Sequence, residues 1–150
     1  MSQYPLWNQL NTLKEAQWVD LTHTFDPNIP RFSEFEKGEV STLFNVKDHG
    51  FYVQRWSIVT QYGTHIDAPI HFVENRRYLE ELDLKELVLP LIVLDYSKEA
   101  AQNSDFIVSR KHLEDWEQQH GRIEADTFVA LRTDWSKRWP DTVSYTHLTL

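Results

Sequence analysis

The residues of this chain that could do chemistry gather in one short stretch, Gln61 to Phe72, which reads QYGTHIDAPIHF. Its candidate side chains fall at odd-numbered positions, so an extended backbone would direct them all to one face; they are Gln61, His65, Asp67 and His71. Gly63 and Pro69 argue against a helix, because glycine weakens a helix interior and proline breaks it. An extended segment that bends at these two residues would gather the four side chains into one pocket.

The chemistry open to this set is metal binding and proton transfer. Imidazole and carboxylate groups are the ligands expected around Zn²⁺, whereas an amide oxygen such as that of Gln61 suits a harder ion such as Mn²⁺. Imidazole also titrates near neutral pH and can therefore carry a proton. A single His-x-Asp pair is most often incidental surface sequence, so the metal interpretation depends on the whole stretch.

The whole stretch resembles the signature His-x-Gly-Thr-His-x-Asp-x-Pro-x-His of the metal-dependent cyclase-family hydrolases, which include bacterial kynurenine formamidases and isatin hydrolases. Every fixed position matches except the first, where Gln61 replaces histidine. The resemblance implies a divalent metal, Zn or Mn, held by His65, Asp67 and Gln61. It also implies that His71 shuttles a proton during hydrolysis of an amide C–N bond, in a formamide or a lactam.

The segments before this stretch must position it. Asn8 to Gln17 has the apolar spacing of a short amphipathic helix, and Trp18 to His23 alternates like a short strand. Phe25 to Phe32 contains two prolines and is expected to be an irregular loop at the lip of a pocket. Phe32 falls where the resembled family places an aromatic residue that holds the substrate, usually tryptophan.

A strand pair is expected to lead directly into the stretch. Val40 to Val46 and Phe51 to Thr60 are rich in strand-forming residues, and Lys47 to Gly50 between them has the composition of a turn.

After the stretch, Glu80 to Leu87 predicts a short helix or turn, and Leu91 to Leu94 predicts a fully buried strand. A helix should begin after Ser109 and end at Gly121, and Asp126 to Arg132 reads as a second buried strand. These elements predict an α/β fold with a mixed sheet and flanking helices. The resemblance, which covers about residues 18–141, implies the swivelling β/β/α architecture of the cyclase family.

Composition narrows the remaining function classes. The chain has 150 residues, enough for one domain, and its net charge of −8 with no cluster of Lys or Arg argues against nucleic acid as a partner. It has no cysteine, and no apolar run approaches the ~20 residues that span a bilayer, which predicts no membrane association. Met1 to Leu13 lacks the apolar core of a signal peptide, so a cytoplasmic location is expected.

The end of the sequence departs from the resembled family, whose members are longer and supply a further metal-binding His and a Glu. Neither is identifiable here, and Val143 to Leu148 resembles a translated adaptor used in preparing sequencing libraries. We therefore expect a partial hydrolase domain over residues 1–142, incomplete at its C-terminus, and a non-native tail over 143–150, although a natural short tail is the alternative.

Two functions remain open at this point. The first is a metal-dependent hydrolase of a small-molecule amide or lactam, which would assemble as a homo-oligomer when full length, as the resemblance implies. The second is a non-catalytic fragment or pseudoenzyme that acts only in packing or in binding a partner. Gln61 and the absent Glu favour the second function, whereas the intact His65, Asp67 and His71 favour the first.

Overall fold

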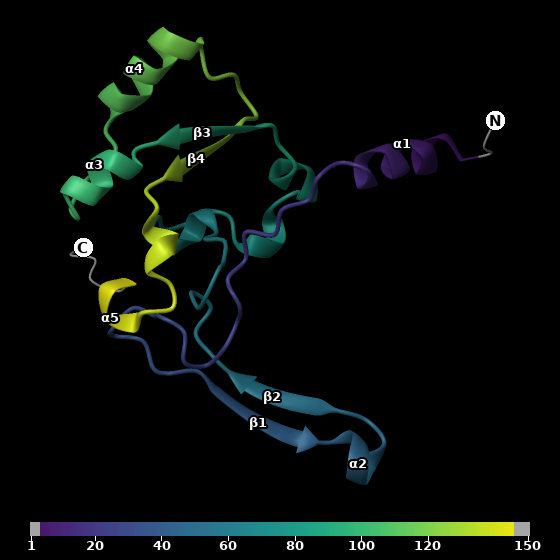
Figure 1. Ribbon diagram of the computed structural model, residues 1–150. Helices are drawn as coiled ribbons and strands as arrows, with labels where there is room; N and C mark the ends of the chain where they lie inside the picture. The colour runs from purple at the N-terminus through teal and green to yellow at the C-terminus, as the bar shows by residue number, and fades with distance from the viewer. Residues whose placement is uncertain (1–3, 146–150) are drawn as a thin grey trace.

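The chain folds around two small, separate sheets, as the computed structural model in Figure 1 shows for residues 4–145. One sheet is an antiparallel pair and the other is a parallel pair, and helices flank the parallel pair. The expected α/β class with flanking helices is confirmed, with the two kinds of strand pairing divided between the two sheets.

The antiparallel pair is the hairpin expected before the chemical stretch. Strand β1 (Glu39–Phe44) pairs with β2 (Val53–Ser57), and the connection contains a single helical turn, α2 (Val46–His49). The Asn45 side chain caps this turn by accepting a backbone N–H bond, and Gly50 ends it with a left-handed backbone (φ 80°). The hairpin projects away from the rest of the molecule (Figure 1).

The parallel pair joins β3 (Leu91–Asp95) to β4 (Phe128–Arg132). The crossover between them carries α3 (Ser97–Gln102), which the sequence did not predict, and α4 (Arg110–His120). Helix α4 starts and stops as expected: Ser109 is its N-cap, and Gly121 follows its end with φ 94°.

The expectation that both parallel strands are fully buried is wrong. In β3 only Leu94 is buried, at 2% exposure, whereas Leu91 remains 57% exposed. In β4 Phe128 is 56% exposed. A two-stranded sheet has no inner strand that neighbours enclose on both sides, so the apolar run does not produce burial here.

The N-terminal segment differs from expectation in two ways. Helix α1 spans Pro5–Lys14 and begins at a proline, which suits the first turn of a helix, rather than at Asn8. Residues 18–23 form no strand, and two of their amides bond to side chains instead: Thr22 donates to Asp20 Oδ1 at 2.8 Å, and His23 donates to Thr64 Oγ1 at 3.1 Å.

Short helical turns make up the rest of the described chain. They are η1 (Pro69–His71), η2 (Leu79–Glu81), η3 (Leu84–Leu87), η4 (Trp135–Arg138) and α5 (Thr142–Tyr145). The turns η2 and η3 fulfil the expectation for Glu80 to Leu87. Within residues 4–145 no helix is long and apolar enough to cross a membrane.

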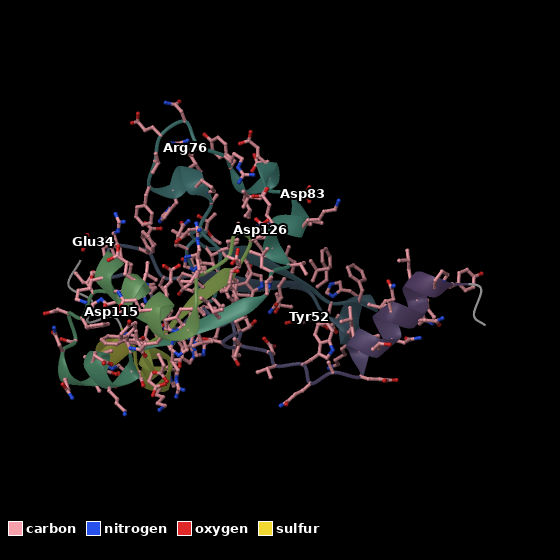
Figure 2. All side chains as sticks on the ribbon, turned by 90° about the horizontal axis from the view of Figure 1, so that it is seen from above. Glu34, Tyr52, Arg76, Asp83, Asp115 and Asp126 are labelled. Atoms are coloured by element: carbon pink, nitrogen blue, oxygen red, sulfur yellow. The ribbon has the colours of Figure 1, made fainter. Side chains whose placement is uncertain are left out.

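Little of the described chain is buried. The buried hydrophobic residues are Ile29, Tyr62, Leu94 and Ala100, and the accessible surface totals 13096 Å². A compact protein of 17.9 kDa would expose about 8,000 Å². Figure 2 shows side chains extending outward from most of the ribbon, with charged residues such as Arg76 and Asp83 at the periphery. The molecule therefore presents much apolar surface that further protein could cover.

Candidate active site

The predicted site residues lie around one pocket of about 520 Å³. Gln61, His65, Asp67, His71 and Phe32 all line it. The other lining residues, which include several aromatic rings, are Pro30, Arg31, Phe35, Gly63, Phe72, Trp139 and Tyr145. The structure thus brings the predicted set together, while the role of each member remains a proposal.

Gly63 provides the first bend of the chemical stretch. Its φ of 70° lies in the left-handed region, and a Cβ placed on it would meet Phe25 Cδ2 at 3.0 Å and Ile29 Cδ1 at 3.1 Å. The backbone therefore turns where it packs against two side chains of the preceding loop. This position requires glycine for both its backbone angle and its contacts.

The second bend places His71 differently from expectation. Pro69 opens the turn η1, whose His71 amide donates to the Ala68 carbonyl at 2.8 Å. His71 therefore reaches the pocket on a helical turn, and not through the alternation of an extended strand. The predicted bend at Pro69 is present, but the shared-parity reasoning holds no further than Ala68.

The contacts of the His65 ring show which of its nitrogens carries a hydrogen. His65 Nδ1 lies 2.8 Å from the Gly63 carbonyl oxygen, which can only accept a hydrogen bond, so Nδ1 carries the proton. In the neutral ring Nε2 then holds a free lone pair, and it lies 3.3 Å from Asp67 Oδ1. Two electron-pair donors that face each other in this way attract a cation between them.

His71 faces the same carboxylate oxygen at longer range. Its Nε2 lies 3.9 Å from Asp67 Oδ1, which is beyond hydrogen-bond distance. The ring packs edge-on against Phe72, with centroids 4.3 Å apart. His71 is thus oriented into the pocket with its Nε2 able to bond water or a ligand.

A bound divalent ion requires a definite spacing between its ligands. Two ligands of a tetrahedral zinc at about 2.0 Å each lie about 3.3 Å apart. The separation of 3.3 Å between His65 Nε2 and Asp67 Oδ1 matches that value. Gln61 Oε1 accepts a bond from Thr60 Oγ1 at 2.6 Å and keeps a second lone pair.

The fit is partial, because the spacing that matches a metal site is that of His65 and Asp67 alone. In residues 4–145 no group of three or more His, Cys, Asp or Glu side chains is arranged to hold a metal ion. His65 and Asp67 could therefore supply two of the ligands of a metal ion.

Two contacts outside the pocket hold the stretch in place. The Tyr62 hydroxyl, on a side chain only 3% exposed, donates to the Pro27 carbonyl at 2.6 Å and accepts from the Gly38 amide at 3.2 Å. Tyr62 thereby joins the loop before β1 to the segment that carries Gln61 and Gly63.

On the other side of the pocket, the Ile70 amide donates to the Arg77 carbonyl at 3.1 Å. The Arg77 guanidinium makes two hydrogen bonds to Glu86, at 2.7 and 2.8 Å, which lower the pKa of that carboxyl to about 2. This pair therefore stays ionised at neutral pH and ties η1 to η3.

Three residues that line the pocket were not predicted from the sequence: Phe35, Trp139 and Tyr145. Phe35 packs edge-on against Phe32 with centroids 5.3 Å apart, and Trp139 comes from the segment after β4. No local pattern marks these positions, since they reach the pocket through tertiary packing. The pocket lining therefore combines two histidines and a carboxylate with several aromatic rings.

Replacing Gly63 by alanine should lower the free energy of unfolding by more than ~2 kcal/mol, because strain at positive φ adds to the clash with Phe25 and Ile29. Gly50→Ala is a matched control, since its φ is 80° but nothing lies within 4 Å of the new Cβ. Gly50→Ala should therefore lower the free energy of unfolding only by the backbone strain, about 1 kcal/mol. Urea unfolding of both variants tests this, and equal losses would contradict the close approach at Gly63.

The fold and the pocket define an α/β protein with a histidine–carboxylate site of the donor type used by metal-dependent hydrolases. The Cyclase family model, described as "Putative cyclase", matches residues 19–150. The chain belongs to the cyclase family, which confirms the resemblance seen in residues 61–72.

Individual relatives are consistent with this family. The chain is 33% identical over 144 residues to the isatin hydrolase of Roseibium aggregatum, covering 87% of this chain and 55% of that protein. It is 31% identical over 81 residues to the kynurenine formamidase of Geobacillus thermodenitrificans, covering 53% of this chain and 39% of that protein. The chain spans about half the length of the curated relatives it matches.

Solved structures show the same fold. An isatin hydrolase bound to the product analogue thioisatinate matches with a TM-score of 0.81 at 30% identity, covering 96% of this chain and 61% of that one. Isatin hydrolase A from Ralstonia solanacearum matches with a TM-score of 0.80 at 28% identity, covering 99% of this chain and 61% of that one.

Proposed function

We propose that this chain carries the metal-binding and proton-transfer part of a hydrolase that cleaves the amide C–N bond of a formamide or a lactam. One observation carries the proposal: His65 Nε2 and His71 Nε2 both face Asp67 Oδ1, at 3.3 and 3.9 Å, on the floor of an aromatic-walled pocket. The names of the relatives support it, since isatin hydrolase acts on a lactam and kynurenine formamidase on a formamide.

In this proposal His65, Asp67 and Gln61 hold a divalent ion, Zn or Mn. When bound, such an ion polarises a carbonyl group and makes water more acidic. His65 would bind through Nε2, because the Gly63 carbonyl holds the proton on Nδ1. Asp67 would supply the negative charge that favours a cation at this position.

His71 would act as the general acid–base. Its Nε2 is oriented toward the pocket but is not committed to a hydrogen bond with Asp67. It can take a proton from water and return it to the nitrogen that leaves, since imidazole exchanges protons near neutral pH. Phe32 would contact the flat part of the substrate from the wall of the pocket.

The test is hydrolysis by the purified 150-residue chain supplied with Zn²⁺ or Mn²⁺. We expect measurable cleavage of isatin or of an aryl formamide, together with saturable metal binding measured by calorimetry. A chain that binds metal without cleaving either substrate would favour the non-catalytic alternative. A chain that binds no metal would contradict the proposal.

The proposal also includes assembly as a homo-oligomer and a cytoplasmic location. Apolar residues such as Leu6 (79% exposed) and Phe72 (85% exposed) leave surface that association could bury, which supports a homo-oligomer. A cytoplasmic location stays a prediction from the sequence.

Replacing Gln61 by histidine should raise the affinity for zinc about 10-fold, because imidazole is a better zinc ligand than a neutral amide oxygen. Chelator-competition titration of wild type and Gln61→His measures this difference. Gln54→His, on β2 and away from the pocket, is the matched control and should leave zinc affinity unchanged. Equal affinities for all three proteins would place Gln61 outside the metal's coordination sphere.

A further inference from the structure

The Trp139 side chain forms a wall of the candidate active site, although it comes from a segment distant in sequence from the metal-binding stretch. It follows the turn η4, where its amide donates to the Ser136 carbonyl at 3.1 Å. Its side chain lines the same pocket as His65, Asp67 and His71. The proposed metal-binding, proton-transfer and substrate-contact roles do not involve this tryptophan.

One face of the Trp139 ring is covered by His23. The two rings are stacked, with centroids 4.2 Å apart and planes only 9° from parallel. Tyr145 meets the tryptophan edge-on at 5.1 Å, with an interplanar angle of 87°. Because two aromatic neighbours restrain the indole, its orientation at the pocket is set by packing.

His23 is itself tied to the metal-binding stretch. Its backbone amide donates to Thr64 Oγ1 at 3.1 Å, and Thr64 directly precedes His65. The irregular segment of residues 18–23 therefore serves as a link: it joins the residue next to His65 to the stack that holds Trp139. The segment was predicted to be a strand, and that prediction did not indicate a role in positioning Trp139.

The remaining walls match a flat ligand. Phe32 and Phe35 line the pocket together with Trp139, and Arg31, which also lines it, donates its Nε hydrogen to the Phe35 carbonyl at 3.1 Å. Aromatic rings bind planar groups by stacking or by edge contacts, and they discriminate poorly among small aliphatic groups.

We propose that Trp139 is a specificity-determining residue that contacts the planar ring attached to the scissile amide, and that His23 is a positioning residue that holds the indole by stacking behind it. The proposal rests on the proposed function and extends it from the amide to the group beside it. It predicts a preference for aryl amides over aliphatic amides that depends on these two side chains.

Binding provides a test that does not require turnover. Thioisatinate is titrated into the 150-residue chain by calorimetry, with and without Zn²⁺. Trp139→Ala should raise its Kd about 10-fold, whereas Trp139→Phe, which keeps a flat ring, should stay within about 3-fold of wild type. Trp7→Ala is the matched control: Trp7 is 51% exposed on α1 and lies outside the pocket, so its loss should leave Kd unchanged.

The positioning role has its own readout. His23→Ala should raise the Kd for thioisatinate about 3- to 5-fold, and His23→Phe should restore it, because a phenyl ring can stack on the indole as the imidazole does. Thermal melting of each variant identifies loss of folding. A His23→Phe protein that melts like wild type but binds as weakly as His23→Ala would overturn the positioning role.

Substrate comparison separates this inference from the proposed function. Cleavage of an aryl formamide and of N-methylformamide is followed in parallel for wild type, Trp139→Ala and Trp139→Phe. A loss confined to the aryl substrate in Trp139→Ala supports the inference. Equal losses on both substrates, or none, would overturn it while leaving amide hydrolysis intact. If no protein cleaves either amide or binds metal, the proposed function fails, and the thioisatinate titration still decides the role of Trp139.

Discussion

Replacing His71 by alanine should lower the turnover of an amide substrate about 10²- to 10⁴-fold, the usual contribution of a positioned general acid–base. Metal content should remain nearly unchanged. The reason is geometric: His71 Nε2 lies 3.9 Å from Asp67 Oδ1, farther than the 3.3 Å that separates His65 Nε2 from the same oxygen. Steady-state rates on the metal-loaded protein, together with elemental analysis of the same sample, measure both quantities.

A matched histidine controls for the general effect of removing an imidazole. His120 is exposed at the end of α4, where its Nδ1 contacts only the Trp116 carbonyl at 3.0 Å and its ring stacks on Trp116. His120→Ala should therefore retain full turnover and metal. If His71→Ala is purified without metal, His71 is a ligand and the proton carrier must be another group.

Removing His65 or Asp67 should have a different outcome, in which the metal and the activity are lost together. Each variant would delete one bond to the ion, and such a loss should exceed the about 10- to 100-fold that an outer partner contributes to metal affinity. Elemental analysis after desalting, combined with chelator competition, tests both alanine variants.

Asp67→Asn refines this test because it keeps an oxygen at the same position and removes only the charge. It should bind metal more weakly than wild type but more tightly than Asp67→Ala. Full metal occupancy in His65→Ala would show that the imidazole and the carboxylate, although 3.3 Å apart, do not share an ion.

The clustering of the candidate residues around one pocket was more predictable from the sequence than the packing around them. Gly63 and Pro69 predicted the two bends for local reasons. Glycine permits backbone angles that other residues rarely adopt, and proline fixes its own φ. The spacing of His65 and Asp67 then placed both on one face. His71 also lines the pocket, but it is carried by the helical turn η1 and not by the extended backbone from which its position was predicted.

Local signals also predicted the hairpin and helix α4. The turn residues around Gly50 and the caps Ser109 and Gly121 act within a few residues of their own position, so they can be read without tertiary context. Where structure depends on distant partners, the sequence was less informative. Residues 18–23 alternate like a strand, but within residues 4–145 they pair with no neighbouring strand.

Burial was the least predictable property. The run Leu91 to Leu94 is apolar enough for the centre of a sheet, yet in a two-stranded sheet only Leu94 is enclosed. The aromatic walls were missed for a related reason: the stacking of Trp139 on His23 joins two segments that share no local pattern.

The Tyr62 hydroxyl has a consequence for motion at the pocket. It bonds at once to the Pro27 carbonyl and the Gly38 amide, and it is carried by the residue between Gln61 and Gly63. Residues 27–38 therefore cannot fluctuate far from residues 61–72 without breaking these bonds and exposing a side chain that is 3% accessible. The two segments then form one cooperative unit of local unfolding, in which a loosened rim also releases the backbone that aligns His65.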